Sequence, residues 1–230
     1  MIDKKEIRIK FPSLNSLKNF IKEVKLFPLY YILTIYLSFY ILPFEIWDKK
    51  TFYHLWSYEE YLAEHFQFIL YFLASLFSFL NILRNKYKVF GIQNLFWMFF
   101  CILTFIISIE EISFLDLLKD SSFEFLREFN TSREINLHNS SLIGPNINYI
   151  YILVNLFLGF FGWKFFSVIE AIPQKKYSLF FLFCSLAYIF LELGEIIPLI
   201  PFIHQEIFEF LMSLGLFLNT FERFIKYSKS

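Results

Sequence analysis

Long continuous apolar runs constrain this chain more than any other feature. An apolar run of about 20 residues has the length that an α-helix needs to cross about 30 Å of hydrocarbon. The apolar residues follow one another instead of alternating, which argues against a membrane β-barrel. The runs therefore predict an all-α fold, a polytopic membrane helical bundle with about six transmembrane helices. They cover residues 27–46, 61–83, 90–110, 148–170, 178–200 and 206–225.

The polar segments outside these runs predict helices that lie on the membrane surface. Residues 1–26 are polar but carry apolar residues at helical spacing, as expected of an interfacial helix. Residues 27–230 are predicted to form a single transmembrane domain. Its one long linker, 111–147, is rich in Ser, Asn and charge, and its short apolar clusters favour one or two further interfacial helices.

The distribution of charge predicts the orientation in the membrane. The net charge is +0, so no overall field favours nucleic acid as a partner. Most of the 21 Lys and Arg residues lie near the two termini or in the linkers at 84–88 and 175–176. Basic residues gather on the cytoplasmic side of membrane proteins. The pattern therefore predicts a multi-pass protein of the cell membrane with both termini in the cytoplasm and the 111–147 segment outside. Membrane lipid is the expected partner, and the oligomeric state is left open.

Acid pairs in four of the runs predict a shared polar site near the outer surface. In three of the four pairs, a spacing of three or four residues puts both carboxylates on one helix face. Acids at a helix start complement the helix dipole, which alone accounts for Glu60 and Glu206, whereas acids at a helix end gain nothing from it. The pairs are Glu60 and Glu64, Glu110 and Glu111, Glu192 and Glu195, and Glu206 and Glu209, with His138 and His204 at the same level.

Carboxylates gathered at membrane depth must be neutralised by protons or by a cation. Carboxylates alone favour Mg²⁺, Mn²⁺ or Ca²⁺, and an added histidine admits Zn²⁺ or iron. The candidate metal ligands are Glu64, Glu110, Glu111, His138, Glu192, Glu195, His204, Glu206 and Glu209. The candidate catalytic residues are Glu110, Glu111, Ser113 and His138. The chain has no His-x-x-x-His, His-Glu-x-x-His or Glu-x-x-His motif, so the alternative that the acids are merely solvated at the interface stays open.

Two sequence blocks resemble a widespread group of bacterial multi-pass membrane proteins of unknown activity. That group carries Glu-Glu-Ile-Ser-Trp-Gly-Gln after a span and then a Glu-x-Asn-Leu-His-Asn block. Residues 110–113 and 134–139 match these blocks, whereas Phe114-Leu115-Asp116 departs from Trp-Gly-Gln. The resemblance implies a membrane fold and gives no activity. A weaker similarity, in ingredients only, is to alkaline ceramidases and adiponectin-type receptors, which combine Glu, Ser, Asp and His around zinc.

Three functional hypotheses follow from these features. The first is a metal- or proton-dependent hydrolase or transferase that acts on a lipid-type substrate at the outer leaflet. The second is a non-catalytic membrane scaffold or partner-binding subunit. The third is an ion- or proton-coupled transporter, although transporters commonly place their site near the midplane between two repeats, and no internal repeat is visible here.

Overall fold

The computed structural model describes residues 23–41, 62–84, 91–111, 146–196 and 205–228. This part of the chain is all-α and contains no strand, which confirms the all-α part of the predicted fold class. Six helical segments lie where the apolar runs predicted them, the fourth being the continuous α8–α9 helix. They are α2 (Phe27–Ile41), α4 (Leu62–Arg84), α5 (Ile92–Glu111), α8 (Ile147–Leu156) with α9 (Gly162–Phe165), α10 (Ser178–Ile196) and α11 (Gln205–Ser228).

Three of these helices are long and apolar enough to cross a membrane within the part of the chain that the structure describes. They are the helices over Glu64–Arg84, Ile92–Glu111 and Ile147–Phe165. Their large apolar side chains are exposed on the outside of the bundle, as Leu83, Ile92 and Leu153 show. Several buried positions hold polar side chains such as Gln67, and this arrangement suits a lipid solvent better than water.

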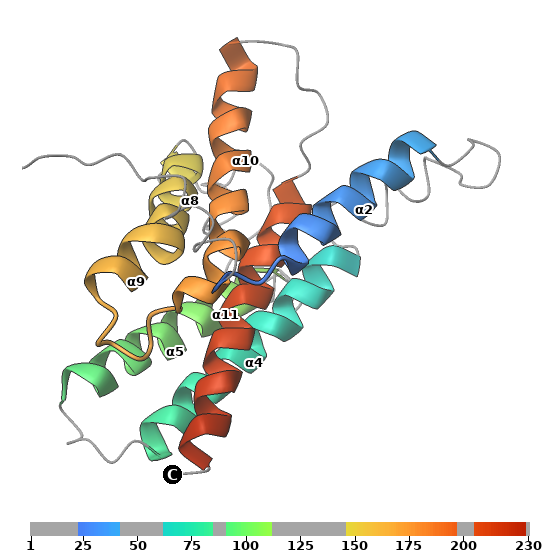
Figure 1. Cartoon of the computed structure of the whole chain (residues 1–230). Helices are drawn as coiled ribbons and strands as arrows, with labels where there is room; N and C mark the ends of the chain where they lie inside the picture. The colour runs from blue at the N-terminus through green and yellow to red at the C-terminus, as the bar shows by residue number, and fades with distance from the viewer. Residues whose placement is uncertain (1–22, 42–61, 85–90, 112–145, 197–204, 229–230) are drawn as a thin grey trace, which may run out of the picture.

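The helices pack in two groups that meet at α10 and α11. α4 packs against both α11 and α5, and α10 packs against α8 and α11 (Figure 1). The first half of α2 packs against α10 and α11, where Phe27 meets Phe180 and Tyr31 meets Phe210, and its far end projects away from the bundle (Figure 1).

The last residue of α5, Glu111, lies toward the same end of the bundle as the starts of α8 and α11, and we call this the Glu111 end. Lys176, just before α10, pairs with Glu222 near the end of α11 at the opposite end, which we call the Lys176 end.

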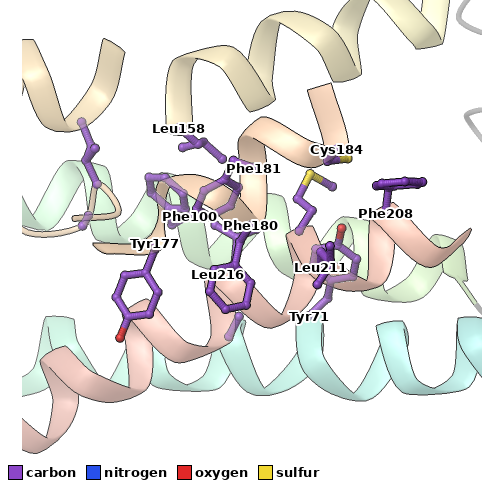
Figure 2. Packing of buried hydrophobic residues seen from close by; sticks show 14 of the residues in the cluster. Tyr71, Phe100, Leu158, Tyr177, Phe180, Phe181, Cys184, Phe208, Leu211 and Leu216 are labelled. Carbon is purple, nitrogen blue, oxygen red and sulfur yellow. The ribbon is translucent and has the colours of Figure 1, made fainter. Parts of the chain in front are cut away.

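Aromatic side chains fill the space where the helices meet. Figure 2 shows Phe100, Phe180 and Phe181 gathered with Leu216, and all four are buried. Gly215 allows this close approach, because a Cβ placed there would lie 2.7 Å from the Cβ of Phe180. The missing side chain therefore sets the separation of α10 and α11.

The fourth helix contains a π-helical turn and stops before the predicted end at about residue 170. The turn spans Phe157–Phe161, and the α-helix ends at Phe165. Residues 166–174 form a connection that folds under the bundle, where Ile172 is buried against Gly162. A side chain at Gly162 would leave no room for this contact, since its Cβ would lie 2.7 Å from Cγ2 of Ile172.

Side-chain amides from two helices hold this connection in place. Gln93 Nε2 donates to the carbonyl of Val168 at 2.5 Å, and Gln93 Oε1 accepts from the Glu170 N–H at 2.9 Å. Asn219 Nδ2 on α11 donates to the carbonyl of Ala171 at 3.2 Å. These bonds satisfy backbone groups of a non-helical segment, which a membrane-embedded bundle must do within the protein.

Candidate functional site

The structure describes the side chains of four of the predicted site residues. They are Glu64, Glu110, Glu111 and Glu209. Glu192, Glu195 and Glu206 lie in α10 and α11, but their side chains are outside the described part. Ser113, His138 and His204 lie outside the described residues altogether. The structure can therefore address the predicted convergence only for carboxylates in α4, α5 and α11, and of these Glu111 and Glu209 both act electrostatically on Tyr151.

Glu209 is the central residue of the site that the structure shows. It lies one turn inside the start of α11, where the helix dipole favours a negative charge. Its side chain is only 5% exposed, and the hydroxyl of Tyr188 on α10 donates a hydrogen bond to Oε1. A buried carboxylate needs such donors, because an isolated charge is costly in a low-dielectric interior.

A second tyrosine links this carboxylate to α5. Tyr151 on α8 stacks on Tyr188, with ring centroids 4.5 Å apart and ring planes at 12°. Tyr151 also lies within electrostatic reach of Glu209, Tyr71 and Glu111. One aromatic pair thus connects groups from α4, α5, α8, α10 and α11 at the Glu111 end. We call these five residues the tyrosine–carboxylate cluster.

The tyrosines of this cluster are the functional candidates that the sequence analysis missed. Their rings are largely hydrophobic, so they counted as apolar residues of the predicted spans; they are Tyr71, Tyr151 and Tyr188. A signal was nevertheless present, since a tyrosine inside a run otherwise rich in Phe has a hydroxyl that needs a polar partner when buried. Combined with the acid pairs, that signal points to the same end of the bundle.

The chemistry of the described cluster is that of proton donors and acceptors. Carboxylates and phenols can exchange protons and can bind a hydroxyl group of a substrate. No group of three His, Cys, Asp or Glu side chains is close enough to hold a metal ion within the described ranges. The predicted metal ligand set includes residues beyond those ranges, so the metal site stays a prediction.

Cys101 on α5 and Cys184 on α10 are free cysteines inside apolar helices. They form no disulfide with each other, and Cys184 is buried beside the cluster. Ser75 Oγ on α4 donates to the carbonyl of Cys101 at 2.9 Å and joins α4 to α5.

Comparison with known proteins adds no assignment to this geometry. No protein-family model, curated protein or solved structure matches the chain.

Proposed function

We propose that this chain is a membrane-embedded hydrolase or transferase that acts on a lipid-type substrate at the outer leaflet. In this proposal the protein is a multi-pass protein of the cell membrane, both termini lie in the cytoplasm and the Glu111 end faces outward. The three long apolar helices and the cluster of basic residues at the Lys176 end support this orientation.

The observation that carries the proposal is the buried Glu209 carboxylate, whose donor Tyr188 stacks on Tyr151. Glu111 and Glu209 both lie within electrostatic reach of Tyr151. Ionisable groups at membrane depth are expensive and mark functional sites. Uncharged residues could pack here at a lower desolvation cost, so the presence of two carboxylates favours a catalytic role over a purely structural one.

General acid–base catalysis uses both carboxyl groups. Glu209, whose negative charge the start of α11 and the Tyr188 hydroxyl stabilise, takes the proton of an attacking hydroxyl or water. The attacking oxygen then forms a bond to the ester carbon or phosphorus of the substrate. The bond to the leaving oxygen breaks, and Glu111, in its protonated form, supplies the proton that this oxygen needs. Tyr188 holds Glu209 in place. In the metal-dependent form, the predicted ligands His138 and His204 would help to bind a divalent cation.

A lipid-turnover assay tests this function directly. The purified protein is reconstituted in vesicles of a total polar lipid extract, and lipids are analysed by mass spectrometry over time. We expect new or depleted lipid species with wild-type protein and none with Glu209→Gln or Glu111→Gln. Glu23→Gln is the control, since this exposed acid lies at the Lys176 end and pairs only with the surface residue Lys175 in the described structure.

Two outcomes would replace the proposal. Lipids left unchanged by wild-type protein, together with a proton or cation flux that depends on Glu209, would establish the transporter hypothesis. Unchanged lipids without flux would favour the scaffold hypothesis. Elemental analysis of the same protein decides the metal-dependent form, which is excluded if no Zn, Mg, Mn or Ca copurifies and none raises the melting temperature.

A further inference from the structure

A group of cations surrounds Tyr177 at the Lys176 end, far from the tyrosine–carboxylate cluster. Lys25 Nζ donates to the Tyr177 hydroxyl at 3.3 Å and lies 4.5 Å from the ring centroid. Lys176 Nζ lies 5.3 Å from the same centroid, and the Lys25 N–H donates to the Lys176 carbonyl at 2.8 Å. Segments that are distant in sequence therefore place two ammonium groups around one aromatic ring.

One carboxylate serves both of these lysines. Glu222 on α11 pairs with Lys176 and accepts a hydrogen bond from Tyr177. Burial lowers the pKa of Lys25, the Glu222 carboxylate opposes this shift and the Lys176 charge adds to it. The local charge is therefore more positive than one carboxylate can balance.

Arg223, next to Glu222 on α11, adds a third positive charge that is buried. It is 6% exposed, and with the Gln174 amide oriented to accept, its Nη2 and Nη1 lie 2.7 and 3.2 Å from Gln174 Oε1. Its Nε has no hydrogen-bond partner, and no ion pair to Arg223 occurs within the described ranges. Glu170, which like Arg223 acts electrostatically on Tyr227, accepts a hydrogen bond from that tyrosine.

A buried guanidinium without a carboxylate is costly, and an anion restores the balance. Arginine binds phosphate oxygens through two parallel N–H donors, and basic sites between helices on the cytoplasmic side bind lipid headgroups. Exposed apolar residues at the end of α9 and in the adjoining connection offer contact to acyl chains, namely Phe165, Phe166 and Val168, and Val168 is 78% exposed.

We propose that Arg223, Lys25 and Lys176 bind the phosphate of an anionic phospholipid in the cytoplasmic leaflet. The apolar surface beside the cations favours a lipid over free phosphate as the source of this group. The proposal uses the orientation given above but not the enzymatic activity. It can therefore hold if the lipid-turnover assay fails.

Retention of lipid by the purified protein tests this site. The protein is exchanged into detergent with equal amounts of phosphatidylglycerol and phosphatidylcholine, passed over a sizing column and analysed by native mass spectrometry. We expect wild-type protein to retain phosphatidylglycerol preferentially and Arg223→Gln to retain about tenfold less, which corresponds to about 1.4 kcal/mol of binding free energy. Lys226→Gln is the matched control, because it removes the same charge from an exposed position of the same helix.

A second variant covers the case in which Arg223→Gln fails to fold. Lys25→Gln removes an exposed member of the same group and is expected to reduce retention several-fold while the helices stay intact. Equal retention by wild type, Lys25→Gln and Lys226→Gln would overturn the proposal. So would a rise in melting temperature with inorganic phosphate that depends on Arg223 and equals the effect of the lipid, since the site would then take free phosphate.

Discussion

At the residue scale, the hydrogen bond between Tyr188 and Glu209 is the contact that the proposed site depends on most. Glu209 lies in the interior of the bundle, where water cannot replace a lost donor. Removing one partner of a buried hydrogen bond leaves the other with its full desolvation cost. The bond therefore contributes to folding as well as to the position of the carboxyl group.

Tyr188→Phe is expected to lower the free energy of unfolding by about 1–3 kcal/mol, because the Glu209 carboxylate loses its donor. Thermal unfolding in detergent, followed by circular dichroism, measures the change. Tyr30→Phe is the control, since that tyrosine is 60% exposed on α2. An equal effect of the two substitutions would show that the bond makes no special contribution.

Tyr177 makes stability depend on alkaline pH. Burial raises the pKa of its phenol, and the hydrogen bond to Glu222 adds to this shift. The folded protein therefore holds the proton more tightly than the unfolded chain, in which tyrosine titrates near pH 10. The stabilisation is complete below about pH 10 and is lost as the pH rises above it. We expect the melting temperature to fall more steeply between pH 9 and 11 in wild type than in Tyr177→Phe, as about 10 is the midpoint for the unfolded residue. Parallel curves would contradict this account.

At the element scale, the contact of α10 with α11 depends on a residue without a side chain. Gly215→Ala would place its Cβ 2.7 Å from Phe180 Cβ, inside van der Waals contact. Because both atoms belong to packed helices, one helix must shift, and overpacking of this kind costs about 1–3 kcal/mol. Ile225→Ala, on an exposed position of α11, is the control and is expected to leave the melting temperature unchanged. A Gly215→Ala protein as stable as wild type would mean that α10 and α11 can move apart without cost, and that Gly215 does not set their separation.

Helix positions were predictable from the apolar runs, but the end of the fourth helix was not. Its apolar run continues past Phe165, so composition gave no reason to stop there. The connection turns under the bundle because Gln93 and Asn219 satisfy its backbone groups. Those partners come from other helices, and hydropathy along one segment does not contain this information.

At the scale of the whole molecule, the predicted orientation is open to a direct test. Cys101 and Cys184 are first replaced by serine, and single cysteines are then introduced as Ser140→Cys or Lys226→Cys. A membrane-impermeant thiol reagent applied to intact cells is expected to label Ser140→Cys, and to label Lys226→Cys only after lysis. Labelling in the reverse order would invert the bundle and move the proposed enzymatic site to the cytoplasmic leaflet.

The sequence by itself determined the all-α character of the chain and the positions of the six helical segments that the structure describes. Apolar length is a local property, and a helix satisfies its own backbone hydrogen bonds, so no tertiary contact is needed to predict it. Only the tertiary structure decided that Tyr188 donates to Glu209, that Tyr151 stacks on Tyr188 and that Arg223 is buried against Gln174. Those relations join residues on different segments of the chain, and they depend on how the helices pack and rotate against one another.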